Sequence, residues 1–283
     1  TIVSQNGDID LLVTFSAENA VNTDDTIFIQ TVNAGNISVG SGTESVTADH
    51  VEIQSAGTID LAAALTATGT TSLIINAAGD ITADDNDITS ASYIEIASTG
   101  GNIALDSNLI QAATYVEIAA DNGSVTVGNA TTDDVVAGSY IDVDANTFIT
   151  TNASFSAGTD VTLTATNGDI TAESAINTVN GAISIAAGND ALINAALEAN
   201  ATGSITIEAD QDVITGASGS LTSDSFILVD AGGLADFGAA LDAGTYIDIT
   251  AVGTIDFAAS LNADGDNGGV GINVLSTGAG AIT

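Results

Sequence analysis

Carboxylates are the side chains of this sequence with the widest chemical range. The chain holds 37 Asp and Glu residues and one His, His50, but no Lys, Arg or Cys. One His without a Cys, and without a Ser partner at a motif spacing, supports neither a nucleophilic triad nor a zinc site. The absence of Cys also excludes disulfide and thiolate chemistry.

Paired carboxylates suggest polysaccharide cleavage, because glycosidases use two carboxyl groups. The pairs Asp24-Asp25, Asp84-Asp85 and Asp133-Asp134 fall in predicted turns, where Asp is favoured for its turn geometry alone. A lyase acting on an acidic polysaccharide would also need Lys or Arg to neutralise its substrate. We therefore expect no enzymatic activity.

Calcium is the candidate metal, because it prefers oxygen ligands. Glu95, Glu117 and Asp142 each occupy the middle position of an apolar-polar-apolar run that recurs about every 22 residues. If these runs are stacked strands, the three like charges lie about 5 Å apart. Such a column needs either a cation or full hydration. The segment 264–269, with Asp264 and Asp266, loosely suggests a calcium loop, although it lacks the terminal Glu of an EF-hand. Solvated turns are the alternative interpretation at both places.

Tyrosines occur at one repeated position. All four, Tyr93, Tyr115, Tyr140 and Tyr246, come immediately before an apolar-polar-apolar run, so strand alternation points them outward. Three of them occur in successive repeats and are candidates for an aromatic ladder. Two interpretations stay open: stacking between neighbouring coils for stability, and a lateral contact stripe for another subunit or a glycan.

The absence of basic residues restricts the partners. At a formal charge of −37 the chain offers no counter-charge to a phosphate backbone or to anionic lipid. We therefore exclude nucleic acid and anionic membranes as direct partners. The hydrophobic content of 45% is nevertheless enough to bury a core, so the acidity does not predict disorder.

A repeat positions these residues. A Gly followed by an alternating strand recurs every 22 residues at Gly35, Gly57, Gly79, Gly101 and Gly123. The phase recurs less regularly at Gly168, Gly233 and Gly253, with degenerate copies around Phe148, Ile193 and Val213.

Two further apolar points follow each Gly. The first is one apolar residue: Leu65, Ile88, Leu109, Phe155, Ile176, Leu197, Leu241 or Leu261. The second is an apolar-polar-apolar run such as Ile94 to Ile96 or Val116 to Ile118. Period-two alternation between turn residues predicts three short strands in each repeat.

One repeat cannot bury its apolar face alone, whereas stacked repeats form parallel ladders about 4.8 Å apart. We therefore predict an all-β fold, a single parallel β-helix (β-solenoid) of about 12–13 coils of about 22 residues with three short strands each. We expect it to run through residues 1–283 as one continuous β-solenoid. Residues 280–283 read as the opening strand of another coil, so we expect a segment of a longer protein.

The strand openings carry a family resemblance. Gly79-Asp80-Ile81-Thr82 and Gly168-Asp169-Ile170-Thr171 resemble the filamentous-haemagglutinin-like and adhesin-like parallel β-helix repeats of large bacterial surface exoproteins. The resemblance implies an extracellular or cell-surface location.

The repeat, without a catalytic constellation, favours a structural role. We expect a structural subunit or rigid spacer of an extracellular or cell-surface filament, matrix or surface layer, which assembles end to end with itself through coil stacking. The alternative function is an adhesin passenger segment that binds glycans or surfaces along its flank. Calcium is the one cofactor considered.

Overall fold

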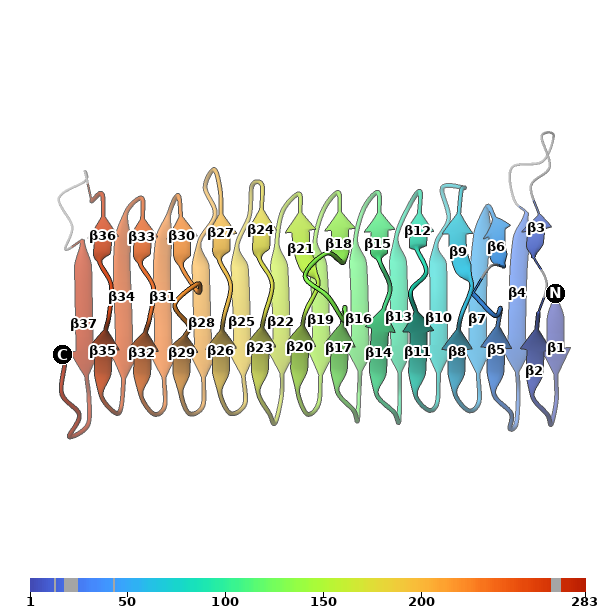
Figure 1. Ribbon diagram of the computed structural model, residues 1–283, viewed down its shortest axis with the longest axis horizontal. Coiled ribbons are helices and arrows are strands. Elements are labelled where there is room, and N and C mark those ends of the chain that lie inside the picture. The colour runs from blue at the N-terminus through green and yellow to red at the C-terminus, as the bar shows by residue number, and fades with distance from the viewer. Residues whose placement is uncertain (13, 18–24, 43, 266–270) are drawn as a thin grey trace. The chain divides into compact units, whose positions relative to one another are not determined.

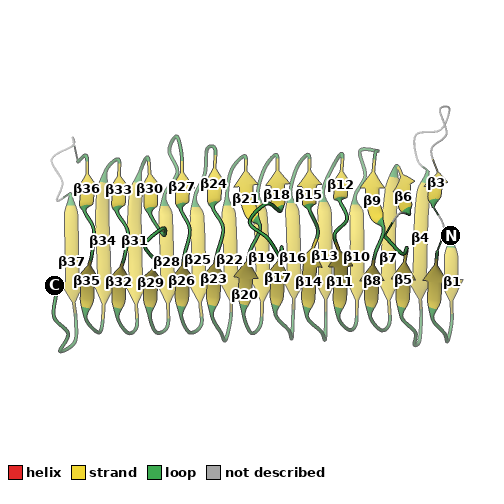
Figure 2. Ribbon diagram, viewed as in Figure 1, coloured by secondary structure: helices red, strands yellow, loops and turns green. Residues whose placement is uncertain are grey.

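Short strands joined by turns build the whole described structure. The computed structural model describes residues 1–12, 14–17, 25–42, 44–265 and 271–283. Within these ranges there is no helix, and so none long and apolar enough to cross a membrane (Figure 2). The predicted all-β fold of three-stranded parallel coils, a β-solenoid, is confirmed.

The chain divides into two compact units, residues 1–146 and 147–283. Each unit contains three parallel sheets, and each coil contributes one strand to each sheet (Figure 1). The prediction that one solenoid runs through residues 1–283 stays a prediction.

In the first unit, strands of successive coils are neighbours in each sheet. The first sheet has the order β1 (Ile2–Ser4), β4 (Thr26–Thr31), β7 (His50–Ser55), β10 (Leu73–Ala77), β13 (Ile94–Ser98), β16 (Val116–Ala120) and β19 (Ile141–Ala145). The second has the order β2 (Ile9–Leu11), β5 (Ile37–Val39), β8 (Ile59–Leu61), β11 (Ile81–Asp84), β14 (Ile103–Asp106) and β17 (Val125–Val127). The third has the order β3 (Phe15–Ala17), β6 (Ser45–Ala48), β9 (Ala64–Ala67), β12 (Ile88–Ser90), β15 (Leu109–Ala112) and β18 (Asp134–Ala137).

The second unit repeats this plan. Its first sheet has the order β22 (Val161–Ala165), β25 (Ile183–Ala187), β28 (Ile205–Ala209), β31 (Phe226–Ala231), β34 (Tyr246–Ala251) and β37 (Ile272–Ser276). Its second has the order β20 (Ile149–Thr151), β23 (Ile170–Ala172), β26 (Ala191–Ile193), β29 (Val213–Thr215), β32 (Ala235–Phe237) and β35 (Ile255–Phe257). Its third has the order β21 (Ser154–Ala157), β24 (Ile176–Thr178), β27 (Leu197–Ala199), β30 (Leu221–Ser223), β33 (Leu241–Ala243) and β36 (Leu261–Ala263).

The core consists of columns of apolar side chains in register. One column of the first unit contains Ile37, Ile59, Ile81, Ile103 and Val125, each almost fully buried. These are the apolar residues that follow the five regularly spaced glycines. Strands inside the stack, such as β7 and β13, bury alternate residues because successive side chains point to opposite faces.

One predicted core position is wrong. Leu109 was expected to face the core, but its neighbour Ile110 is 1% exposed and pairs with the buried Ile88. Ala112, also buried, continues the alternation from Ile110. Because Leu109 and Ile110 are both apolar, hydropathy could not choose between the two registers.

Candidate functional site

The tyrosines and carboxylates singled out in the first unit lie side by side on the outward face of its first sheet. The strands β13, β16 and β19 pair in parallel, which aligns Glu95 with Glu117 and Glu117 with Asp142. We call these three residues the carboxylate column. The predicted alignment of the column is therefore confirmed.

Tyr93, Tyr115 and Tyr140 form a continuous stack, here called the tyrosine stack. The ring centroids of Tyr93 and Tyr115 are 4.7 Å apart and those of Tyr115 and Tyr140 are 4.9 Å apart, with interplanar angles of 10° and 3°. This spacing follows the separation of neighbouring strands. The aromatic ladder expected from the sequence is confirmed, and its inner ring faces are covered by the neighbouring rings.

Tyr115 and Tyr140 each donate a hydrogen bond to a carboxylate of the preceding coil. The hydroxyl of Tyr115 donates to Glu95 Oε1 at 2.9 Å, and that of Tyr140 donates to Glu117 Oε1 at 2.5 Å. Burial, followed by the hydrogen bond to Glu117, raises the pKa of Tyr140 to about 12. Burial and the hydrogen bond to Glu95 also raise the pKa of Tyr115. Both phenols therefore stay protonated at neutral pH.

Asp142 ends the carboxylate column in a less favourable environment. Burial, with the nearby charges of Asp144 and Glu117, raises its pKa to about 6. Within the described part of the chain, its buried Oδ1 atom has no hydrogen-bond partner. A carboxylate that is neither fully hydrated nor bonded favours its protonated form.

The candidate calcium ligands do not form a coordination cluster in this structure. No group of three or more His, Asp or Glu side chains among the described residues is arranged to hold a metal ion. Asp264 lies directly after β36, where its backbone N–H donates to Ala243 O, and Asp266 lies outside the described residues. Calcium binding therefore stays a prediction at both places.

Tyr246, in the second unit, lies at the start of β34. Its ring stacks on Phe226 with a centroid distance of 5.0 Å, and 40% of the residue is exposed. Its position immediately before the buried Ile247 is equivalent to that of the other three tyrosines. Its ring partner is a phenylalanine, so this contact is not part of the tyrosine stack.

Asp and Asn residues have a further structural use that was not predicted from the sequence. In several coils, an Asp or Asn lies immediately before the first inward-facing residue of the second-sheet strand. Its Oδ1 atom accepts a hydrogen bond from the backbone N–H of the residue at the equivalent position in the next coil. We call this the Asx ladder. The pairs, each written with the accepting side chain first and the donating backbone N–H second, are Asp8 and Asn36, Asn36 and Thr58, Asp80 and Asn102, Asn102 and Ser124, Asp169 and Asp190, Asp190 and Asp212, and Asp212 and Leu234.

The Asx ladder explains the Gly-Asp/Asn-Ile signature physically. Backbone groups at a turn need partners, and a side-chain oxygen from the preceding coil supplies one. The 22-residue recurrence of Asp and Asn in the sequence was the signal that could have predicted it. The ladder thus gives a structural role to five acids: Asp8, Asp80, Asp169, Asp190 and Asp212.

Other acids and the histidine also have structural partners. Asp133, only 3% exposed, accepts the backbone N–H groups of Asn129 and Ala130 through Oδ2 at 2.9 and 3.0 Å. His50 Nδ1 lies 2.8 Å from the backbone oxygen of Ser72. Each of these contacts fixes a turn or joins neighbouring coils.

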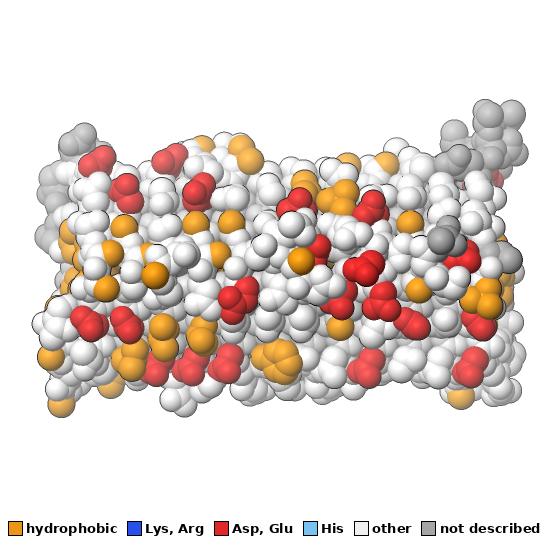
Figure 3. All heavy atoms as spheres, in the orientation of Figure 1, with side chains coloured by type: hydrophobic (Ala, Val, Ile, Leu, Met, Phe, Trp, Pro, Cys, Tyr) orange, Lys and Arg blue, Asp and Glu red, His pale blue; other side chains and the backbone are white. Residues whose placement is uncertain are grey.

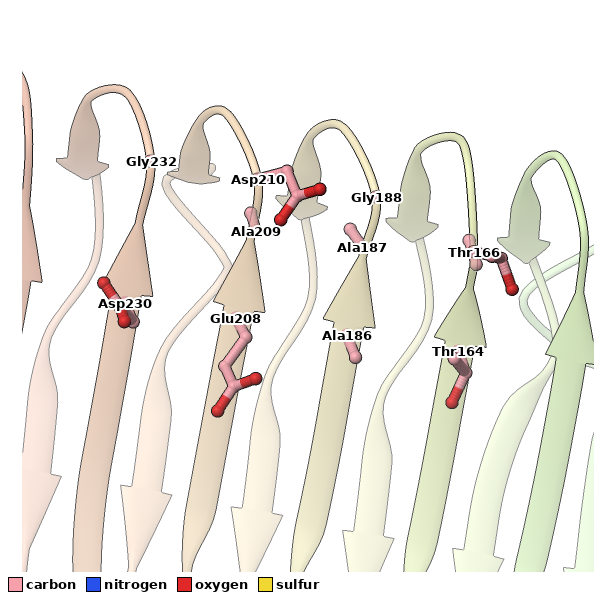
Figure 4. A pocket seen from close by; sticks show the side chains of 11 residues that line it. Thr164, Thr166, Ala186, Ala187, Gly188, Glu208, Ala209, Asp210, Asp230 and Gly232 are labelled. Atoms are coloured by element: carbon pink, nitrogen blue, oxygen red, sulfur yellow. The ribbon is translucent and has the colours of Figure 1, made fainter.

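A groove lies on the outward face of the first sheet of the second unit. Its volume is about 450 Å³, and Figure 4 shows acidic side chains beside a floor of small residues. Pairing of β25, β28 and β31 aligns Ala186, Glu208 and Asp230, so two carboxylates are adjacent. Asp210 lies in the turn beyond β28. Such a groove has room for a small polar ligand, although no aromatic side chain lines it.

Comparison with family models, with curated proteins and with solved structures finds no match to this chain.

Proposed function

We propose that this chain is a non-enzymatic structural element, a rigid spacer or subunit of an extracellular or cell-surface filament that extends by stacking further β-coils. The observation that carries the proposal is the open edge of the first coil. Among the described residues, its strands β1, β2 and β3 pair on one side only, with β4, β5 and β6. An unpaired edge is a template for another strand at the same spacing.

Apolar exposure supports the same proposal. Ile272 in β37 is 40% exposed, whereas Ile247, its partner in β34, is fully buried. In the first coil, the inward residue Leu11 is only half-buried, whereas Val39, its partner in β5, is 1% exposed. A further coil of this protein, from the same chain or another copy, would remove such surface from water and be favoured by the hydrophobic effect.

The distribution of charge favours axial over lateral contacts. With 37 acidic residues and no basic ones, two flanks packed together would bring like charges out of water. Carboxylates are visible over the face presented in Figure 3, which shows no Lys or Arg. Stacking at a coil edge leaves those carboxylates in solvent.

An edge-blocking variant tests the proposal. Ile9 N donates to Asn36 O and Gly40 N donates to Leu11 O, so the backbone of Ile9 and Leu11 faces the next coil. The N–H of Asp10, between them, points to the unpaired side, because successive residues of a parallel strand bond to opposite neighbours. Asp10→Pro therefore removes a donor from the open edge and leaves the bonds to β5 in place.

The measurement is sedimentation velocity of the 283-residue chain over a concentration series, with electron microscopy of the same samples. Asp10→Ala is the matched control, since it removes the same charge but keeps the N–H. We expect linear assemblies from the unsubstituted chain and from Asp10→Ala, and dispersed molecules from Asp10→Pro. Equal assembly of the two variants, or an unsubstituted chain that stays monomeric at all concentrations, would contradict the proposal.

Glycan binding along the flank is the second candidate function, and the groove beside Glu208 and Asp230 favours it. Pockets with a few convergent polar groups are the usual places for small ligands. It ranks second because the groove lacks the aromatic platform on which sugar rings stack. Filling its floor with Ala186→Leu should abolish oligosaccharide binding in calorimetry if the groove is the site.

A further inference from the structure

The tyrosine stack places three oxidisable rings in sequence on one face of the first unit. We propose that it is an oxidative modification site, at which two neighbouring tyrosines join through a carbon–carbon bond to form dityrosine. The bond would link adjacent coils covalently. This inference does not depend on the proposed filament, because both partners lie in one unit of one chain.

The geometry of the rings favours coupling between neighbours. Their centroids are 4.7 and 4.9 Å apart and the planes are within 10° of parallel. The hydroxyls of Tyr115 and Tyr140 both point toward a carboxylate of the preceding coil. The two rings therefore lie in the same sense, with the carbons next to each hydroxyl facing their counterparts. All three tyrosines are partly exposed, so an external oxidant can reach them.

The carboxylate column provides bases for the oxidation step. A phenol loses an electron more readily when its proton moves at the same time to a nearby acceptor. Glu95 Oε1, at 2.9 Å from the hydroxyl of Tyr115, and Glu117 Oε1, at 2.5 Å from that of Tyr140, are positioned to take those protons. They act as positioning and proton-accepting groups and are regenerated by exchange with solvent.

The reaction needs a one-electron oxidant, and a haem peroxidase with hydrogen peroxide provides it. Two tyrosines each give one electron to the peroxidase and one hydroxyl proton to a base. The two phenoxyl radicals then join through the ring carbons next to their oxygens, forming one C–C bond. The hydrogens on those carbons move to the oxygens through solvent, which restores both phenols. One hydrogen peroxide takes the two electrons and two protons and becomes two waters.

Tyr246 provides an internal comparison. It is at the equivalent place in its coil and is 40% exposed, but it stacks on Phe226. Phenylalanine has no hydroxyl proton to give up and resists one-electron oxidation under these conditions. Tyr246 should therefore be oxidised without joining a neighbour in its own unit.

The experiment treats dilute 283-residue chain with peroxidase and hydrogen peroxide, then isolates the monomer under denaturing conditions. Dityrosine is measured by its fluorescence, and the joined peptides are identified by mass spectrometry after cleavage at Asp and Glu. We expect a peptide pair that joins Tyr115 to Tyr93 or to Tyr140. Tyr115→Phe keeps the stacked ring but removes the shared partner, so the signal from monomer should be lost.

Three variants complete the design. Tyr93→Phe and Tyr140→Phe each leave one tyrosine pair and should retain the intramolecular product, and Tyr246→Phe should leave its yield unchanged. Far-ultraviolet circular dichroism confirms that each variant is folded. The proposal is overturned if Tyr115→Phe monomer gives the unsubstituted yield, if all dityrosine lies in covalent dimers, or if the unsubstituted monomer gives none.

Discussion

At the scale of single residues, five of the acids have a structural use in the Asx ladder: Asp8, Asp80, Asp169, Asp190 and Asp212. Asp and Asn were predicted in turns for their own geometry. The Asx ladder shows that they also accept hydrogen bonds from the coil that follows. The recurrence of Asp and Asn signals this second use but does not by itself place the side-chain oxygen against a backbone N–H that lies 21 to 28 positions later, as for Asp212 and Leu234. Only the stacking of coils brings the two groups together.

The Asx ladder predicts a difference between two substitutions at Asp212. Its Oδ1 accepts the backbone N–H of Leu234 at 2.8 Å, in a partly buried position. Asp212→Ala should lower the free energy of unfolding by about 1–3 kcal/mol, because it leaves that N–H without its partner. Asp212→Asn keeps the acceptor oxygen and removes one negative charge, so it should be close to neutral. Urea denaturation measures both, and equal losses would contradict the ladder's role.

Asp142 predicts a pH dependence of stability. Its pKa is about 6 in the folded chain, raised by burial and by Asp144 and Glu117, against an ordinary value of 3.8. Between these values the folded state binds a proton that the unfolded state does not. The contribution of Asp142 to the free energy of unfolding therefore falls as pH rises through this window, and it is constant above about pH 6.

Comparison with Asp142→Asn isolates this effect from the other acids. The variant should gain stability over the unsubstituted chain as pH rises from about 4 to above 6, as measured by urea denaturation at each pH. A difference in free energy of unfolding between the two proteins that stays constant with pH, or that changes in the opposite direction, would contradict a raised pKa of Asp142 in the folded chain.

At the scale of elements, spacing predicted which strands form and hydropathy predicted which side chains are buried. The five glycines at intervals of 22 residues gave five strands of the second sheet of the first unit, and the paired apolar residues such as Ile94 and Ile96 are buried as expected. The error at Leu109 arose where two adjacent apolar residues made the alternation ambiguous. The alignment of the carboxylate column followed from the same phase argument.

The contacts of the candidate site were less predictable than its placement. Alternation placed Tyr93, Tyr115 and Tyr140 on the outward face, and the structure confirms their stacking. Tyr115 and Tyr140 donate hydrogen bonds to carboxylates of the preceding coil. These contacts depend on side-chain rotamers, which a period of 22 residues does not determine. The groove beside Glu208 arises from small residues on neighbouring strands, and no sequence motif marks it.

Gly123 tests how closely neighbouring coils approach. A Cβ atom at this position would lie 2.0 Å from Gly101 O in the preceding coil, so the backbone would have to move. Gly123→Ala should therefore lower the free energy of unfolding by about 1–3 kcal/mol. Gly7→Ala is the control, because the nearest atom to its added Cβ is 3.7 Å away. Thermal denaturation that shifts equally for both variants would contradict this account of the turn.

At the scale of the whole molecule, the net charge of −37 predicts a strong response to cations. Salt weakens repulsion between exposed acids over a Debye length of about 8 Å at physiological ionic strength. The melting temperature should rise with sodium chloride. A further rise with calcium at matched ionic strength, reversed by a chelator, would indicate bound calcium rather than screening. A melting temperature that is the same in all these solutions would contradict both effects.

The most direct test of the structural role is fibre diffraction from oriented assemblies of the chain. If further coils stack on the open edge of β1, β2 and β3, the strands lie across the fibre and the pattern has a meridional reflection near 4.8 Å. Asp10→Pro should lose the oriented fibres, whereas Asp10→Ala should retain them. An equatorial reflection at this spacing, or a chain that forms no ordered assembly under any condition that keeps it folded, would contradict end-to-end stacking.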